Sequence, residues 1–227
     1  MSTSTATLDI ETQLESKRDQ LLNRYRTVRA FSERLCATLC TEDYVVQSMP
    51  DASPMRWHLA HTTWFYETFI LAHSPDYRRF NDSFEYLFNS YYNSVGEQYP
   101  RDKRGLLTRP TVEEIIRYRA SIDDLMLETL GRVNQDNDHL LDILELGLNH
   151  EQQHQELMQT DIKHLFAQNP LYPAVSPFEI GTNKNLKPKN WVTFEGGIHH
   201  IGHEGDNFSF DNESPRHRVF LEPYAIC

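Results

Sequence analysis

The sequence predicts a mainly α-helical protein, in which a four-helix bundle is followed by a short, incomplete β-containing segment. Through most of the first 170 residues, apolar side chains recur at intervals of three, four and seven, which is the period of amphipathic helices. After Pro170 this pattern gives way to prolines, glycines and short strand-like runs. We therefore expect a bundle over residues 1–170, a linker over 171–190 and the start of a second domain over 191–227.

Four segments carry the helical pattern, and they cover residues 10–39, 54–73, 111 onward and 138–169. Ser53 followed by Pro54 is typical of a helix start, because serine caps the first turn and proline fits its first position. Thr111 and Glu114 have the spacing of a capping box at the start of the third helix. The connection over residues 80–110 is long and aromatic-rich, and such connections are more often functional than not. Four helices with one long crossover form a bundle whose core can hold a metal.

The last part of the sequence predicts short strands. Residues 191–195 and 198–202 resemble two strands around Gly196-Gly197, and residues 218–222 resemble another. Fewer than about 40 residues are hardly enough for an independently stable domain. We therefore expect this segment to be only the beginning of a domain.

His150 and His154 are the most informative residues of the chain. A helix places residues four apart one above the other, so both imidazoles are directed to one place. They share a face with apolar residues of the fourth predicted helix, so we expect them to point into the bundle. Two histidines leave a divalent ion mostly to water, and a further ligand must come from elsewhere. The alternative is a pair of hydrogen-bonded core histidines without a metal.

The second predicted helix carries the candidate for the third ligand. At 100° per residue, His61 falls in the middle of its aromatic face and His58 falls toward the flank. We therefore predict a metal site formed by His61, His150 and His154. Asp161 lies on the same face of the fourth helix beyond His154, where it would orient a ligand imidazole through a hydrogen bond.

The motif around the histidine pair also matches the zinc-peptidase signature, in which Glu151 would be the general base. That alternative needs a third ligand further along the chain. The candidates are His164, His199, His200, His203 and His217. No second peptidase signature accompanies the motif in the sequence, which argues against this alternative.

Composition excludes several classes of function. The net charge of −11 argues against nucleic acid or an anionic membrane as a partner. No apolar run approaches the ~20 residues that span a bilayer. The first residues lack the basic start and apolar core of a secretory signal, so a cytoplasmic location is expected.

Three stretches together resemble the ergothioneine-pathway sulfoxide synthases, also called hercynine oxygenases. The stretches are residues 43–61 (DYVVQSMPDASPMRWHLAH), 150–164 (HEQQHQELMQTDIKH) and 210–219 (FDNESPRHRV). The resemblance implies a DinB-like four-helix bundle joined to a domain of the formylglycine-generating-enzyme, or sulfatase-modifying-factor, type. It also implies an iron(II) enzyme that uses O2 to join a thiol, cysteine or γ-glutamylcysteine, to the imidazole of trimethylhistidine.

Carried over residue by residue, the resemblance makes His61, His150 and His154 the ligands of Fe(2+). Gln153 matches the position that hydrogen-bonds the imidazole substrate, although a surface glutamine is the alternative. Arg101 and Arg104 match a pair of arginines that bind the carboxylates of the thiol. Guanidinium groups suit carboxylates, but a basic cluster beside a loop is also commonly solvated.

The tyrosine that takes part in oxidation in the family would lie beyond Cys227, so no catalytic residue is assigned here. We expect weak or absent synthase activity unless another polypeptide supplies the rest of the second domain. Two other functions stay open: a zinc-dependent DinB-like thiol transferase and a non-catalytic metal-binding fragment. The ligand set alone does not decide between iron and zinc, because iron binds more weakly in the divalent series.

Overall fold

The computed structural model describes residues 5–132, 138–175 and 190–227. The chain divides into two units, Met1–Pro177 and Phe178–Cys227. Most of the predicted linker over 171–190 lies outside the described residues.

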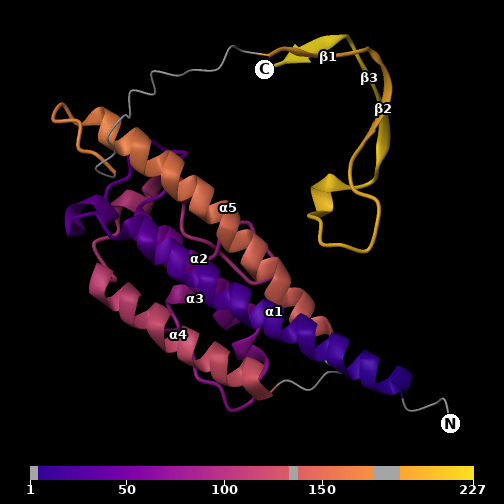
Figure 1. The fold of residues 1–227 in the computed structure, drawn as a ribbon. Coiled ribbons are helices and arrows are strands. Elements are labelled where there is room, and N and C mark those ends of the chain that lie inside the picture. Colours follow the sequence, from indigo (N-terminus) through magenta and orange to yellow (C-terminus); the bar gives the residue numbers. More distant parts are fainter. Residues whose placement is uncertain (1–4, 133–137, 176–189) are drawn as a thin grey trace. The chain divides into compact units, whose positions relative to one another are not determined.

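Four long helices form the first unit, as predicted (Figure 1). They are α1 (Thr5–Cys36), α2 (Met55–Phe69), α4 (Val112–Arg132) and α5 (Asp138–Gln168). The connections contain the short helix α3 (Phe84–Phe88) and the 3-10 segments η1 (Thr41–Tyr44), η2 (Leu71–His73) and η3 (Arg101–Leu106). Several boundaries differ from the prediction. The first helix begins at Thr5 instead of near residue 10, and the second begins at Met55 with Pro54 as its N-cap. The prediction that Ser53 caps the second helix is therefore wrong; its hydroxyl accepts from Arg104 instead. The first helix ends at Cys36 instead of near Leu39, and the second changes to 3-10 geometry after Phe69.

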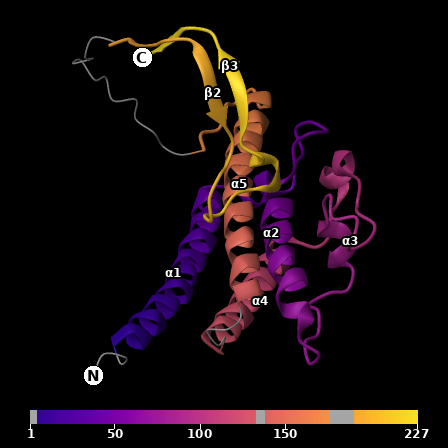
Figure 2. The same cartoon turned by 90° about the vertical axis from the view of Figure 1, so that its right-hand side faces the viewer.

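Helix α2 is the central helix of the unit. Every residue from Met55 to Thr68 is buried, and the helix packs against α3, α4 and α5 (Figure 2). Burial on all sides is typical of a core helix, but such a helix needs partners for its polar side chains. Glu67 illustrates this: its carboxylate accepts hydrogen bonds from the Tyr77 hydroxyl at 2.7 Å, from the Phe80 amide at 2.8 Å and from the Tyr118 hydroxyl. The long connection after α2 is thereby tied to the core.

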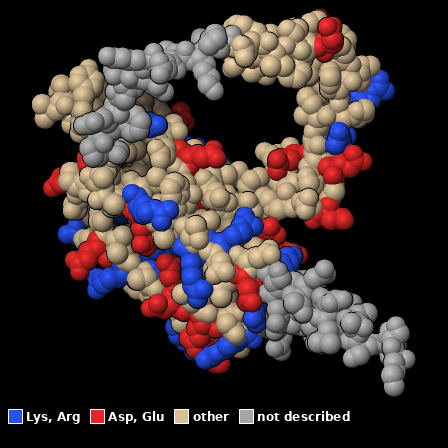
Figure 3. Space-filling view, viewed as in Figure 1, with Lys and Arg blue, Asp and Glu red and all other residues tan. Residues whose placement is uncertain are grey.

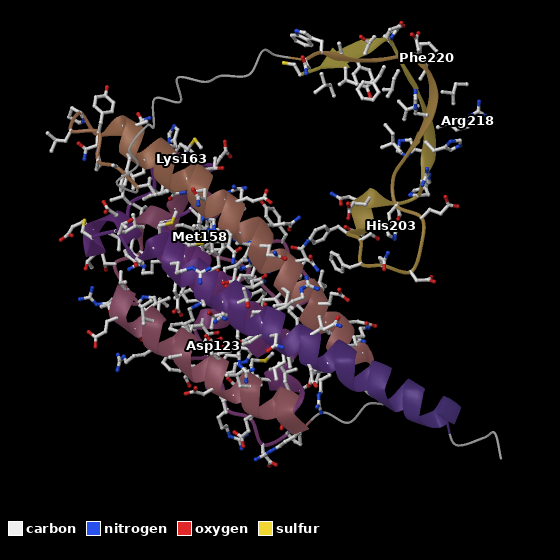
Figure 4. The ribbon with its side chains drawn as sticks, in the orientation of Figure 1. Asp123, Met158, Lys163, His203, Arg218 and Phe220 are labelled. Carbon is white, nitrogen blue, oxygen red and sulfur yellow. The ribbon has the colours of Figure 1, made fainter. Side chains whose placement is uncertain are left out.

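Helix α5 buries a face that lies beside its histidines. The apolar residues of α5 that pack in the core are Leu141, Leu144, Leu148, Met158, Ile162 and Phe166, of which Met158 is labelled in Figure 4. Leu157, which lines a cavity together with His150 and His154, is 41% exposed. The histidine face therefore lies at the edge of the core, where a cavity can open beside it.

Gly147 allows α5 to approach α2 closely. A Cβ atom at this position would lie 2.6 Å from Tyr66 Cε1 and 2.8 Å from Phe65 Cε1. Any larger residue would push the two helices apart. Because His150 follows one turn later, this contact also sets its distance from α2.

The second unit consists of two antiparallel strand pairs. β1 (Val192–Phe194) pairs with β4 (Tyr224–Ile226), and β2 (Gly197–Ile201) pairs with β3 (His217–Leu221). The three predicted strands are present, but the two beside Gly196-Gly197 pair with later strands and not with each other. None of the described residues from 190 to 227 is buried.

The two units differ in surface charge. Basic and acidic side chains are intermixed over the helices of the first unit, whereas much of the visible strand unit is uncharged (Figure 3). Within the described residues, no helix is long and apolar enough to cross a membrane.

Candidate metal centre

Three of the predicted ligands converge in the first unit. His61 on α2 and His150 and His154 on α5 each offer a ligand atom, and these atoms lie within 4.8 Å of one another. The Nε2 atoms of His61 and His150 are 3.2 Å apart. Two nitrogens that each lie about 2.1 Å from one ion are separated by roughly 3.0–3.4 Å. The spacing of this pair therefore fits joint coordination of a single metal.

The three imidazoles are held neutral, which is the state that binds metals. Burial is the main cause: it lowers the pKa of His150 to about 4. Burial and then the neighbouring histidine lower the pKa of His61 and of His154 well below the usual value. Their nitrogen lone pairs are therefore free of protons at neutral pH.

Hydrogen bonds orient two of the ligand rings. His61 Nδ1 lies 2.6 Å from the carbonyl oxygen of Phe88, so Nδ1 carries the proton and Nε2 is left for a metal. His154 Nδ1 lies 2.9 Å from Nδ1 of His58, whose Nε2 is 3.0 Å from a carboxylate oxygen of Asp161. Because a carboxylate only accepts, His58 donates to Asp161 and accepts from His154, which leaves Nε2 of His154 for a metal.

His150 is held differently. Its Nδ1 atom is buried and has no hydrogen-bond partner among the described residues. The ring instead packs against Phe65, with 5.0 Å between ring centroids. Packing from α2, together with the close approach at Gly147, therefore places this ligand.

A cavity of about 280 Å³ opens at the histidines, close to the size of a small-ligand site. The three histidines line it together with both predicted arginines, Arg101 and Arg104, and with Gln153. The structure thus brings together all six predicted site residues. Gln153 is exposed on α5, as its alternative interpretation required, and it also lines the cavity.

Arg104 is a buried cation that has no acidic partner within residues 5–132, 138–175 and 190–227. Its side chain is 3% exposed, donates to Ser53 Oγ at 2.9 Å and to Ser90 Oγ at 3.1 Å, and lies over the Trp57 ring. Burial and the neighbouring Arg101 lower the pKa of Arg104 to about 9. A buried charge is costly unless it is paired, so this guanidinium is poised to receive an anion. The interpretation of the arginines as a solvated cluster is wrong for Arg104.

Arg101 and Arg104 together form one side of the cavity, called the basic wall below, and Arg101 is its more exposed member. Its guanidinium donates to the Tyr91 hydroxyl at 2.9 Å and to the carbonyl of Asp51. Neither arginine forms an ion pair among the described residues. Tyr91 is 72% exposed and has a left-handed φ of 65°, which is uncommon outside glycine.

Some residues of the site were not predicted. His58, placed on the flank of its helix by the sequence, is buried and links Asp161 to His154. Asp161 acts as expected on a histidine, but on His58 instead of on a ligand. Because α2 is buried on all sides, its flank also faces protein. Ser53, Ser90 and Tyr91 come from loops, whose approach to the histidines has no periodic signal in sequence.

Glu151 has another environment. Its carboxylate accepts from Arg119 at 2.7 Å, from Arg29 at 3.1 Å and from Ser32 at 2.7 Å, and it does not line the histidine cavity. Burial alone would raise the pKa of Glu151, but Arg119 and Arg29 lower it to about 2. A carboxylate held in two buried ion pairs is not placed as a general base.

The downstream histidine of the first unit does not complete a peptidase site. His164 binds Ser48 at 2.8 Å and is not part of the ligand cluster. His203, labelled in Figure 4, belongs to the strand unit, as do His199, His200 and His217. The described residues contain no other group of three potential metal ligands besides His61, His150 and His154.

A larger cavity of about 610 Å³ lies on the other side of η3. Its lining comes from residues 45–50 and 105–108, with Arg56 and Asp102 as its charged members. It contains no histidine. The smaller cavity is therefore the candidate site for metal chemistry.

The fold and the site define a class: a helical bundle with a cluster of three histidines suited to a metal ion. Comparison with protein families places the chain more closely. The chain belongs to the DinB superfamily, whose domain matches residues 24–158, more than half of the sequence. The matched region includes the three histidines and both arginines. A search of curated proteins gives no match.

Proposed function

We propose that the histidine cavity binds iron(II) and uses O2 to join a cysteine-containing thiol to trimethylhistidine, forming a sulfoxide. One observation carries the binding part of this proposal: three neutral imidazoles share a cavity with two arginines that form no ion pair in the described part of the chain. Such a cavity suits a metal ion beside a ligand that bears a carboxylate. The identity of the reaction comes from the resemblance of residues 43–61, 150–164 and 210–219 to the sulfoxide synthases.

The residues of the chain have distinct roles in this proposal. His61, His150 and His154 hold the ion and leave coordination positions open, since three ligands do not complete a metal site. Arg104 and Arg101 bind the carboxylate of the thiol at the basic wall. Gln153, at the exposed edge of the cavity, donates to or accepts from the imidazole substrate. Bound iron would supply the O2 chemistry.

The strand unit belongs, in this proposal, to a domain of the formylglycine-generating-enzyme type. Several apolar side chains of the strand unit are exposed, which supports the idea that further β structure packs against them. That β structure would belong to the same polypeptide or to another one. Trp191, Phe194, Ile198 and Phe220 are among the exposed side chains. Isolated strand pairs rarely stay stable without such packing.

The alternative function is a zinc-dependent thiol transferase. The same observations favour it in part, because neutral imidazoles suit zinc as well as iron and the arginines suit a thiol that bears a carboxylate. The two functions differ in what they need. The oxygenase needs iron and O2, whereas the transferase needs zinc and no oxidant.

The test is to load the protein with iron(II) without air, add trimethylhistidine and cysteine or γ-glutamylcysteine, admit air, and look for the sulfoxide by mass spectrometry. Product that is absent from His154→Ala would support the proposal. Absence of product from folded, iron-loaded protein would contradict a complete active site in this chain and favour the metal-binding fragment, whose chemistry needs the rest of the second domain. If zinc-loaded protein instead accelerates alkylation of the thiol by an added alkyl halide, with release of halide and without O2, the transferase is supported.

A further inference from the structure

The backbone that carries both arginines is held by one side chain. Arg101 and Arg104 lie on η3, and the side-chain amide of Gln47 contacts this segment at two points. Its Nε2 donates to the carbonyl of Arg101 at 2.8 Å, and its Oε1 accepts from the amide of Gly105 at 2.7 Å. These two contacts lie at the two ends of the turn that contains both arginines.

Gln47 also forms a hydrogen bond with the segment that contains the hydrogen-bond acceptors of the arginines. Its Nε2 donates to the carbonyl of Ala52 at 2.8 Å. The neighbours of Ala52 are acceptors of the basic wall: the Asp51 carbonyl accepts from Arg101, and Ser53 Oγ accepts from Arg104. One amide therefore connects the backbone of the arginines with the backbone of their partners.

Position 47 needs a side chain that both donates and accepts hydrogen bonds, and an amide does both. Its two short contacts with carbonyl oxygens, and a longer one with the carbonyl of Pro50 at 3.4 Å, need donors. Its contact with the N–H of Gly105 needs an acceptor. A glutamate would set a carboxylate oxygen against the two carbonyls. A methionine of similar length would make none of these hydrogen bonds.

Gly105 fits tightly against this amide. A Cβ atom at Gly105 would lie 2.6 Å from Cβ of Gln47 and 3.2 Å from both its backbone nitrogen and its Oε1. A methyl group here would displace the glutamine from the other side. Gly105 thus offers an independent way to disturb the same contact.

We propose that Gln47 is a positioning residue that sets the spacing of Arg101 and Arg104 and thereby the affinity of the site for a carboxylate-bearing thiol. This inference rests on the proposed function, which assigns the carboxylate to the arginines. Gln47 itself does not line the histidine cavity; it lines the larger cavity behind η3. Its substitution should therefore affect the basic wall and leave the metal ligands in place.

The test compares two thiols that differ only in a carboxylate, cysteine and cysteamine. Binding of each to Co(II)-loaded protein is followed by the thiolate-to-cobalt charge-transfer band, which needs no turnover. The variants are Gln47→Met, Gln47→Glu and Gly105→Ala. We expect each to weaken cysteine binding by about 10- to 100-fold, the effect of losing one charged hydrogen bond, while cysteamine and cobalt affinities change less than about twofold.

The controls separate positioning from general stability. Gly131→Ala adds a methyl group where nothing lies within 4 Å of the new atom, so it should change neither thiol. Leu130→Val weakens the buried core at the far end of α4 and should lower stability without changing the preference for cysteine. Equal losses for cysteine and cysteamine, or an unchanged preference in all three variants, would overturn the inference. A wild-type protein without any preference for cysteine would instead contradict the assignment of the arginines in the proposed function.

Discussion

Two clusters of buried polar groups lie on different sides of α5, although Glu151 of one cluster directly follows His150 of the other in sequence. Around Glu151, the buried guanidinium groups of Arg29 and Arg119 meet the carboxylates of Glu151 and Asp123. Around His150 and His154, the buried Arg104 meets two hydroxyl groups and an aromatic ring, and no carboxylate among the residues that the structure describes. In the first cluster, each buried charge is paired with an opposite charge of the protein. In the second cluster, the arginine charges and the imidazole lone pairs remain available to a bound ligand or metal.

This difference separates a structural role from a binding role within one motif. A compensated buried network links helices and resists change, since removing one partner leaves another buried charge unpaired. A buried network whose charges are not paired lowers the stability of the fold, and such networks are typical of sites where a ligand supplies the missing charge. The Glu151 cluster joins α1, α4 and α5, and so fixes the helix that carries two of the three metal ligands.

The largest effect should follow from breaking the compensated cluster. Arg119→Ala removes one of the two cations at Glu151 and leaves a buried carboxylate with a single ion pair. We expect the free energy of unfolding to fall by about 3–5 kcal/mol, measured by urea denaturation. Arg132→Ala, at an exposed ion pair of the same helix, serves as the control and should cost less than about 1 kcal/mol. Equal costs for the two variants would remove the distinction between the clusters.

Acid should affect the two clusters in separate pH windows. The folded pKa of His150, about 4, lies below its usual 6.5, so the unfolded state takes up protons first as pH falls. Stability is therefore lost from about pH 6.5 down to 4, at up to about 1.4 kcal/mol per pH unit for each such histidine. For Glu151, with pKa about 2 against 4.5, the loss falls between pH 4.5 and 2.

The pH windows are measured by urea denaturation at a series of pH values, with and without Zn(II) or Co(II). A metal that binds the three histidines should raise stability by a roughly constant amount between pH 6.5 and 4, where the folded imidazoles are neutral, and this gain should be lost below about pH 4 as they take up protons. A metal-independent stability profile between pH 6.5 and 4 would contradict the assignment of the histidines as ligands.

A smaller effect should follow from Asp161→Asn. The substitution removes the negative charge that fixes His58 as a donor and thereby frees Nε2 of His154. Loss of such an outer partner typically lowers metal affinity by about 10- to 100-fold. Competition with a chromophoric chelator measures this affinity, and Asp124→Asn, at an exposed position of α4, is the matched control. An unchanged affinity would show that the His58 contact does not orient the ligand.

The smallest effect concerns a hydrogen bond outside both clusters. Thr111 Oγ1 accepts from the amide of Glu114 at the start of α4, as the capping pattern predicted. Thr111→Ala should lower the free energy of unfolding by about 1 kcal/mol and leave metal affinity unchanged. Thermal denaturation with a metal titration tests both statements, and a change in metal affinity would show that the clusters are coupled to this end of α4.

Local patterns predicted much of the fold and the ligand set. The four helices, the cap at Thr111 and the strands after residue 190 follow from spacing and from turn residues, which act within a few positions of each other. His150 and His154 share a face because a helix has 3.6 residues per turn. His61 followed from the same geometry on a second helix, and the structure confirms that it joins the pair.

Tertiary structure decided what lies opposite these residues. Periodicity places His58 and His61 on one helix but does not show that His58 meets His154, because α5 is almost 100 residues away along the chain. Periodicity also does not show that Glu151 and His150 have different partners. The partners of Glu151 come from α1 and α4, so they are set only when these helices pack against α5. The arginines became a buried wall through loop contacts with Gln47, Ser53 and Ser90, which have no sequence period. The sequence by itself determined which groups carry charge and lone pairs, and packing decided which of them are compensated within the protein.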